Sequence, residues 1–315
     1  MERCEVRVPT YKRPQLLKRA LDSLIAQDYP HWIALVMDDS PAQEANAIAA
    51  SYEDDRILYS PNSKNLGSAG NLDRAFTTQE LVGGTYACVL EDDNWLMPTY
   101  LSENIALLKE KSVNLLMRNQ EIWLQTEQQS QPTGRTTRGD WFTARLYTPY
   151  ELYAYLFLLE GASNGGLFWK TSMQTNLQVG SQVVDAGLQE YCRSLQIEDD
   201  FYFAPKPLCY WSEMPVSLSL RNPASDRVFG RGVQSIRMHL IQNDGQEVIE
   251  TAEKLAFHCN KRAEFEWSLI DALYIQYHFQ YVDRLKAAKS YLKSYAKFKL
   301  VKNPLESYLT KGIRK

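Results

Sequence analysis

The chain has 315 residues, of which 44% are hydrophobic, 23% charged and 12% aromatic, a composition that excludes a disordered chain and a fibrous repeat. Its length favours one large domain with a C-terminal appendage, or two domains that share an interface. The net charge of −3 is unevenly placed, because the segment from Arg284 to Lys315 has ten Lys or Arg residues against one acid, Glu306.

No secretion signal and no membrane span are predicted. The N-terminus lacks an apolar stretch of signal-peptide length, and apolar runs such as 156–159 fall far short of the roughly 20 residues of a membrane-spanning helix. The five cysteines form no CxxC pair, and the four histidines share no ligand spacing with them. We therefore expect a cytoplasmic protein with reduced thiols and no structural zinc.

Up to about residue 120, short apolar runs alternate with amphipathic helical patterns. This alternation predicts an α/β fold with a mostly parallel sheet flanked by helices. Crossovers in such a sheet bring the carboxyl ends of the strands to one edge, where open α/β sheets bind ligands. The expected strands are 4–8, 33–37, 56–59 and 85–90, and the expected helices begin at Pro14 and then span 42–52, 69–81 and 98–111.

After residue 113 the spacing of the apolar residues becomes less regular. Arg138-Gly139-Asp140 is an RGD triplet, to which we assign no function because the chain has no secretion signal. A boundary is expected near Asn222-Pro223, followed by mostly helical sequence. The expected elements are strands 113–118 and 121–125, a loop or hairpin tip at 125–137, helix 149–160, strand 166–170, helix 185–195 and strand 207–211.

Two clusters of acidic residues directly follow predicted strands: Asp38-Asp39 and Glu91-Asp92-Asp93. Adjacent acids repel one another, and a hard divalent cation with oxygen ligands best supports their ionised forms. Such a cation needs further ligands, which the phosphates of a nucleotide diphosphate supply. A solvated turn or a helix cap is the alternative for a single Asp pair. Two clusters after two strands favour a binding site.

Four motifs resemble, in order and spacing, those of family 2 glycosyltransferases with the GT-A fold, and the resemblance covers roughly residues 4–220. It implies an inverting enzyme that uses a nucleotide-diphosphate sugar and a divalent metal, Mn²⁺ or Mg²⁺. A dinucleotide enzyme would need a Gly-rich loop after the first strand, which is absent here. The motifs are Val8-Pro9-Thr10-Tyr11-Lys12-Arg13-Pro14, Val36-Met37-Asp38-Asp39-Ser40, Asn65-Leu66-Gly67 to Asn71, and Val89-Leu90-Glu91-Asp92-Asp93-Asn94 with Met97-Pro98.

The resemblance implies a role for each motif. Asp39 matches the acid that hydrogen-bonds the nucleotide base, where an ionised acceptor makes the stronger bond. Tyr11 either stacks on the base or packs against the first helix. Asp93 matches the acid that ligates the metal, and Asp92 the acid that contacts the ribose or the sugar. The other residues expected to bind the nucleotide sugar are Pro9, Thr10, Arg13, Asp38 and Asn65.

The chain departs from the family pattern at two places. Arg7 interrupts the apolar first strand, and Ser40-Pro41 follows the Asp pair where the family usually has Gly. The resemblance divides the chain into a nucleotide-sugar-binding half at 1–118, an acceptor half at 119–221 and a helical C-terminal region with a basic tail at 222–315.

Inversion by single displacement needs a carboxylate that takes the proton of the acceptor hydroxyl. The family places this acid near a helix about 100 residues after the metal motif, which favours Glu190 as the catalytic base. A solvated helix acid is the alternative reading of Glu190. The other candidates for the base are Asp185, Glu198, Asp199 and Asp200.

Three further segments are candidates for a functional role. Asn164-Gly165-Gly166 is either a loop that leaves room for a sugar or acceptor, or a tight turn. Arg221, Arg227 and Arg231 are candidates to close over a pyrophosphate. The C-terminal basic segment is either a solvated packing helix or a helix lying on an anionic membrane at the inner face.

The acceptor remains open among a glycan, a lipid-linked intermediate, a peptide and a small molecule. Nucleic acid is disfavoured, because the acidic body would repel a phosphate backbone. A catalytically inactive sugar-nucleotide or glycan-binding module of the same fold is the alternative to an enzyme.

Overall fold

The computed structural model describes residues 2–126, 129–158, 161–180, 182–214, 223–243 and 245–278. The chain forms two compact units, which we describe separately. The first comprises Met1–Pro149 and Ala162–Leu220, and the second comprises Tyr150–Gly161 and Arg221–Lys315. The segment 150–161, which the sequence analysis included in the acceptor half, thus belongs to the second unit. The predicted basic tail lies outside the described residues.

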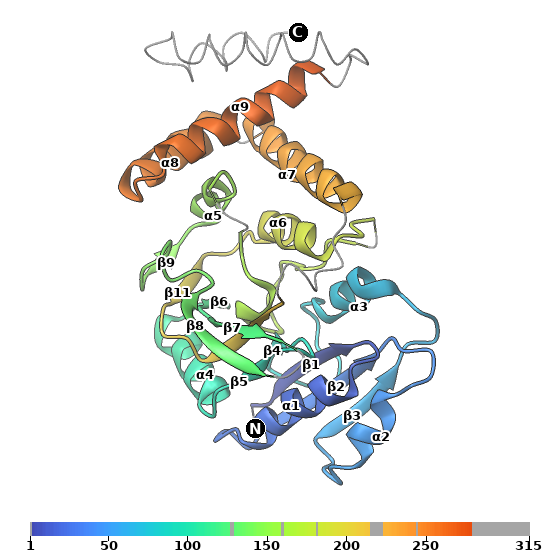
Figure 1. The fold of residues 1–315 in the computed structure, drawn as a ribbon. Helices are drawn as coiled ribbons and strands as arrows, with labels where there is room; N and C mark the ends of the chain where they lie inside the picture. Colours follow the sequence, from blue (N-terminus) through green and yellow to red (C-terminus); the bar gives the residue numbers. More distant parts are fainter. Residues whose placement is uncertain are drawn as a thin grey trace. The chain divides into compact units, whose positions relative to one another are not determined.

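The larger sheet of the first unit has eight strands within the described residues, in the order β3-β2-β1-β4-β10-β6-β11-β9. Pairing is parallel from β3 through β4 and between β6 and β11, whereas β10 runs antiparallel to both of its neighbours. The expected mostly parallel α/β sheet is confirmed (Figure 1). The strands are β1 (Cys4–Thr10), β2 (Trp32–Asp38), β3 (Ile57–Pro61), β4 (Tyr86–Val89), β6 (Leu115–Arg118), β9 (Leu146–Tyr147), β10 (Leu167–Lys170) and β11 (Phe201–Ala204).

A second, smaller sheet has the order β5-β12-β7-β8. Its strands are β5 (Trp95–Leu96), β12 (Cys209–Glu213), β7 (Glu121–Gln125) and β8 (Ser130–Thr136). The segment 125–137, expected to be a loop or hairpin tip, contains the strand β8, which pairs antiparallel with β7. Because β8 lies at the edge of the sheet, it tolerates Pro132 and polar side chains, and these residues resemble a loop in the sequence.

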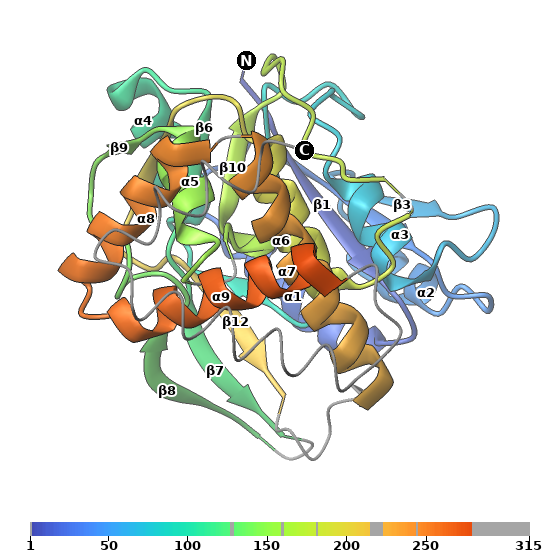
Figure 2. The same cartoon turned by 90° about the horizontal axis from the view of Figure 1, so that it is seen from above.

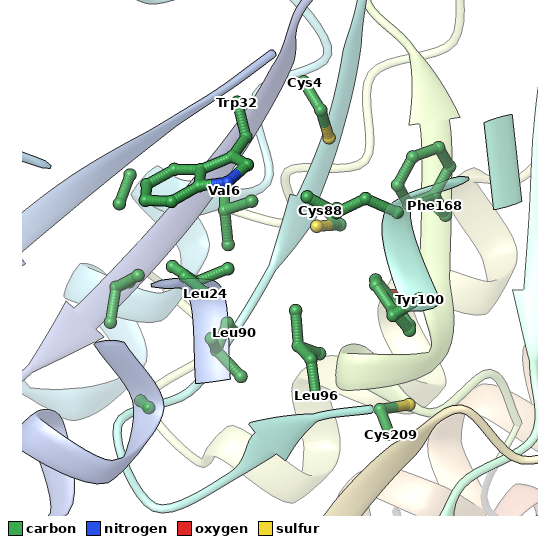
Figure 3. Close-up of a cluster of buried hydrophobic side chains, with 14 of the residues drawn as sticks. Cys4, Val6, Leu24, Trp32, Cys88, Leu90, Leu96, Tyr100, Phe168 and Cys209 are labelled. Carbon is green, nitrogen blue, oxygen red and sulfur yellow. The ribbon is translucent and has the colours of Figure 1, made fainter. Parts of the chain in front are cut away.

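Helices cover both faces of the larger sheet. In β1 the side chains of Cys4, Val6 and Val8 belong to the buried cluster that also contains residues of α1, α2 and α4, as alternation along a strand requires. Figure 3 shows Val6 and Trp32 of this cluster beside Leu24 of α1. The helices of the first unit are α1 (Pro14–Ile25), α2 (Ala45–Ala50), α3 (Gly67–Ala75), α4 (Tyr100–Lys111) and α6 (Ala186–Gln196).

On the opposite face of β1, Glu5 and Arg7 form a fully buried ion pair with an Nη2 to Oε2 distance of 2.8 Å. The Glu5 carboxylate accepts hydrogen bonds from the backbone N–H groups of Leu81, Val82 and Gly84. Arg7 donates to three backbone carbonyl oxygens, those of Ala75, Thr77 and Gln79. Because Arg7 binds these three carbonyl oxygens, helical hydrogen bonds do not continue after Ala75. The helix α3 therefore ends at Ala75, whereas a helix up to residue 81 was expected.

Replacing Glu5 with Gln is expected to lower the free energy of unfolding by about 3–5 kcal/mol, because Arg7 would remain charged and buried without its counter-ion. Urea unfolding measures the loss. Lys18→Met is the matched control, since it removes an exposed ion pair with Asp22 and should cost about 0–1 kcal/mol. Equal losses in the two variants would show that the buried pair does not support the fold in this way.

The second unit is helical, as expected for the sequence after residue 221. Its helices are α7 (Pro223–Asn243), α8 (Gly245–His258) and α9 (Arg262–His278), joined by most of α5 (Pro149–Tyr155); Figure 2 shows them from above. Two contacts tie the segment after α5 to this bundle: Arg237 Nε donates to the carbonyl oxygen of Leu156 at 2.8 Å, and Phe157 meets Phe265 edge to face. Among the described helices, none combines the length and apolarity that crossing a bilayer requires.

Candidate functional site

A cavity of about 290 Å³ lies where the carboxyl ends of β1, β2 and β4 meet. Parallel strands bring these ends together, so residues far apart in the chain share one site. Most of the predicted nucleotide-sugar residues line the cavity, whereas Asp38, Asn65 and Glu190 are not part of its lining. The lining residues are Pro9, Thr10, Tyr11, Arg13, Asp39, Ser68, Asn71, Leu72, Glu91, Asp92, Asp93 and Ala186.

Asp92 is buried and held by the loop that follows β1. Its Oδ2 accepts hydrogen bonds from Thr10 Oγ1 at 2.8 Å and from the N–H of Tyr11 at 3.4 Å. Arg13 Nη1 bridges Asp92 Oδ1 at 3.2 Å and Asp93 Oδ2 at 2.8 Å. Burial and the charge of Asp93 raise the pKa of Asp92 to about 6, against the opposite effects of Arg13 and Thr10. The loop after β1 therefore positions the acids that follow β4.

Glu91 is a third acid at the carboxyl end of β4, next to Asp92 and Asp93. Burial raises its pKa to about 8, and the nearby charges of Asp93, Glu190 and Asp92 add to the effect. A divalent cation would relieve this repulsion, and carboxylate oxygens are suitable ligands for Mg²⁺ or Mn²⁺. Within the described residues no group of three acidic, His or Cys side chains forms a complete metal site. The residues fit a cation that takes its remaining ligands from substrate phosphates.

Asp39 lines the same cavity with one carboxylate oxygen free to accept a hydrogen bond. Its Oδ1 accepts from Asn62 Nδ2 and from the N–H of Leu66, both at 2.8 Å. Its Oδ2 is buried and has no hydrogen-bond partner among the described residues. Leaving a buried polar atom without a partner is costly. A ligand with an N–H group at this position would supply the missing donor.

The neighbouring Asp38 is committed to protein contacts instead. Its Oδ1 accepts from the N–H of Ser40 at 2.9 Å, and its Oδ2 accepts from the Tyr59 hydroxyl at 3.0 Å and from the N–H of Ala45 at 3.3 Å. The Ser40 hydroxyl in turn accepts from the N–H of Lys12 at 2.8 Å. Ser40, which stands where the family usually has Gly, thus ties the loop after β2 to the loop after β1.

Asn65 also supports the loop around Asp39 rather than the cavity wall. Its Nδ2 donates to the carbonyl oxygen of Asp39 at 3.0 Å, and its Oδ1 accepts from the N–H of Gly67 at 3.1 Å. Ligand contact by Asp38 and Asn65 stays a prediction, and their contacts in the structure shape the loop that presents Asp39.

Glu190, the predicted base, lies on α6 within electrostatic range of Glu91. Its Oε1 accepts from the N–H of Asn164 at 2.9 Å. Among the rival acids, Asp185 caps the N-terminus of α6 by accepting from the N–H of Leu188 at 2.8 Å, and Asp199 accepts from the Thr175 hydroxyl at 2.8 Å. The assignment of Glu190 as the base stays a prediction, and the lining of the cavity does not include it.

The Asn164-Gly165-Gly166 segment forms a buried 3₁₀ turn. A Cβ on Gly165 would lie 2.7 Å from Gln120 Nε2, and one on Gly166 would lie 2.5 Å from the carbonyl oxygen of Arg118. These glycines are required by close packing inside the protein, which supports the tight-turn interpretation. Of the arginines expected to close over a pyrophosphate, Arg231 is exposed, Arg221 lies outside the described residues, and only the backbone of Arg227 is described.

Three arginines that join separate parts of the site were not predicted from the sequence. Arg193 is fully buried, and its Nη1 donates to Asn164 Oδ1 at 2.6 Å. Arg19 of α1 stacks on the Trp95 ring with its guanidinium carbon 4.0 Å from the centroid, and also donates to the carbonyl oxygen of Asp93. Arg138, in the discounted RGD triplet, lies 3.5 Å from Glu190 Oε2. Arg193 carries a sequence signal, since it follows Glu190 by one helical turn; the other two depend on tertiary contacts.

Comparison with known proteins agrees with this geometry. Residues 5–153 match the family described as Glycosyl transferase family 2. The chain is 23% identical over 115 residues to UDP-Glc:alpha-D-GlcNAc-diphosphoundecaprenol beta-1,3-glucosyltransferase WfgD of Escherichia coli, covering 36% of this chain and 44% of that protein. It is 30% identical over 105 residues to GalNAc(5)-diNAcBac-PP-undecaprenol beta-1,3-glucosyltransferase of Campylobacter jejuni, covering 32% of this chain and 33% of that protein. The chain thus spans less than half the length of these curated relatives.

Solved structures match over almost the whole chain. S. aureus TarS 1-349 in complex with UDP-GlcNAc has a TM-score of 0.58 at 15% identity, covering 94% of this chain and 91% of that one. The complex with UDP has a TM-score of 0.57 at 16% identity, covering 98% of this chain and 89% of that one. This similarity establishes the GT-A fold. Residues 5–153 are similar to glycosyltransferase family 2, and the similarity of fold extends beyond this segment.

Proposed function

We propose that this protein is an inverting glycosyltransferase that moves a sugar from a nucleotide-diphosphate sugar to an acceptor hydroxyl, with the help of a divalent cation. The observation that carries the proposal is one cavity lined both by the partnerless oxygen of Asp39 and by the acids Glu91, Asp92 and Asp93. The first suits a nucleotide base with an N–H donor, and the second suits a cation bound to a diphosphate.

A uridine nucleotide is the donor that we propose. The imide N–H of uracil can donate to the buried Oδ2 of Asp39, and the exposed ring of Tyr11 offers a face for the base. The names of one relative and of the TarS complexes support this choice, since they include UDP-Glc, UDP and UDP-GlcNAc. Two of the relatives are named for acceptors linked to undecaprenol through diphosphate, and we propose a lipid-linked acceptor here as well.

In the proposed reaction, Asp93 would hold Mn²⁺ or Mg²⁺, and Asp92 would contact the ribose or the sugar. The cation would stabilise negative charge on the departing diphosphate. Glu190 would take the proton of the acceptor hydroxyl while the oxygen of that hydroxyl attacks the anomeric carbon and the bond to the diphosphate breaks. Peripheral contact with an anionic membrane through residues 284–315 stays a prediction, because that segment lies outside the described residues.

Donor hydrolysis tests the proposal. The protein is incubated with UDP-glucose and UDP-GlcNAc in the presence of Mn²⁺, with and without undecaprenyl-diphosphate sugars, and the release of UDP is measured. Slow release without acceptor and faster release with one are expected. Binding of a donor without turnover in any of these mixtures would favour an inactive binding module.

Replacing Asp39 with Asn is expected to weaken UDP binding by about 10–100-fold, because a hydrogen bond to a charged acceptor is worth roughly 1.5–3 kcal/mol. CDP is the informative comparison, since cytosine has an acceptor where uracil has the imide N–H. Isothermal titration should show a marked preference for UDP in the wild type and a reduced preference in the variant. If the variant lost equal affinity for both nucleotides, Asp39 would not read the base.

A further inference from the structure

Arg138 lies in the turn that follows β8 and is 7% exposed. The protein holds it at both its backbone and its side chain. Its backbone N–H donates to Asn119 Oδ1 at 3.0 Å, and its Nη1 donates to the carbonyl oxygen of Thr137 at 2.9 Å. The other terminal nitrogen, Nη2, lies 3.5 Å from Glu190 Oε2. A buried, tethered guanidinium therefore faces the predicted base.

Glu190 is held through both carboxylate oxygens. Oε2 faces Arg138, and Oε1 accepts from the N–H of Asn164 at 2.9 Å. Asn164 is fixed in turn, because its side-chain oxygen accepts from Arg193, whose guanidinium carbon lies 3.6 Å from the centroid of the Phe76 ring. The carboxylate is thus bound by groups from two separate segments, 138 and 164.

Charged groups of other segments lie around Glu190. Glu91, after β4, repels it, and Arg193, on α6, attracts it. The Arg138 guanidinium adds a positive group on the Oε2 side of the carboxylate.

We propose that Arg138 is a positioning residue that holds the carboxylate of Glu190 oriented toward the acceptor hydroxyl. This inference rests on the proposed function, in which Glu190 is the base. It gives a role to a residue in the turn after β8, and it explains why Arg138 is buried at a turn where an exposed arginine would be usual.

The test compares Arg138→Met and Arg138→Lys with Arg135→Met. Arg135 lies in the same hairpin and pairs with Glu213 on the exposed surface, so it is the matched control. Turnover of UDP-glucose and UDP-GlcNAc, UDP affinity and thermal unfolding are measured for each. We expect Arg138→Met to lower kcat by about 10²-fold, as for a misplaced catalytic group, with UDP affinity changed less than twofold. Lys should restore part of kcat, and Arg135→Met should match the wild type.

A double-mutant cycle with Glu190→Gln separates positioning from a general effect on the fold. If Arg138 acts through Glu190, adding Arg138→Met to Glu190→Gln should lower kcat by less than twofold. An undiminished loss in the double variant, or a loss of UDP affinity equal to the loss of kcat, would overturn the positioning role. Normal turnover by Glu190→Gln alone would overturn the assignment of the base, and with it the role of Arg138, while leaving the donor site intact.

Discussion

Asp93→Ala is expected to abolish the metal-dependent part of UDP binding and to lower turnover by about 10³-fold or more. Asp93 is the less buried of the two acids bridged by Arg13, and its carboxylate is 23% exposed at the cavity. Without it, Glu91 and Asp92 would remain at the cavity, and Arg13 would keep Asp92 paired. Titration of UDP with and without Mn²⁺ measures the first effect, and UDP release from UDP-glucose and UDP-GlcNAc measures the second.

Measuring the stability of Asp93→Ala distinguishes the loss of a metal ligand from unfolding of the variant. Burial, together with the charge of Asp93, raises the pKa of Asp92 to about 6 and that of Glu91 to about 8. The stability that their protonated forms contribute is therefore present at low pH and is lost as the pH rises through these values. In EDTA, the wild type should therefore unfold more readily at pH 8.5 than at pH 5.5, and the variant should show a smaller difference. Asp22→Ala, an exposed acid of α1, is the control. Unchanged Mn²⁺-dependent UDP binding in Asp93→Ala would remove the metal assignment.

Glu190→Gln is expected to lower turnover by about 10²–10⁴-fold, the usual contribution of a general base, while UDP binding is retained. The amide has nearly the shape of the carboxylate and can still accept the N–H of Asn164 through its oxygen, but it cannot take a proton from the acceptor. Transfer of sugar to an undecaprenyl-diphosphate acceptor, followed at saturating donor, measures the loss.

Asp200→Asn and Asp199→Asn serve as matched variants for this experiment. Asp200 is exposed, and Asp199 is bound to the Thr175 hydroxyl, so both should retain turnover close to that of the wild type. Normal turnover by Glu190→Gln with a loss in one of these variants would move the catalytic role to that acid.

Most of the larger sheet could be predicted from sequence, because its strands are short apolar runs separated by amphipathic helices. The strands β5, β8 and β9 could not, since β5 and β9 have two residues each and β8 is a polar edge strand. Arg7 broke the apolar pattern of β1, and only the fold reveals that Glu5 neutralises it. Local pattern is thus informative where the core determines the residue type, and uninformative where a distant partner determines it.

In the candidate site, too, local pattern predicts some residues and distant contacts determine the others. The acids after β2 and β4 were found because strand ends in a parallel sheet meet at one edge. The residue pattern alone does not say which of the two adjacent acids lines the cavity, whereas the family resemblance pointed to Asp39. In the structure Asp38 turns toward Tyr59 and the start of α2, and Asp39 lines the cavity. Arg138 could not be found at all, because its contact with Glu190 spans 52 positions of the chain and depends on how the two segments fold.

The position of Arg19 has a practical consequence for engineering this protein. Its guanidinium joins the backbone of Asp93 to Gln125 of β7 and stacks on Trp95 of β5, so one side chain of α1 fastens the acid motif to the second sheet. A chimera that imports the second sheet of a similar protein would sever this connection unless the imported strands supply the same partners. Grafts that exchange α1 together with β5, β7 and β12 should therefore retain donor turnover better than grafts of the strands alone.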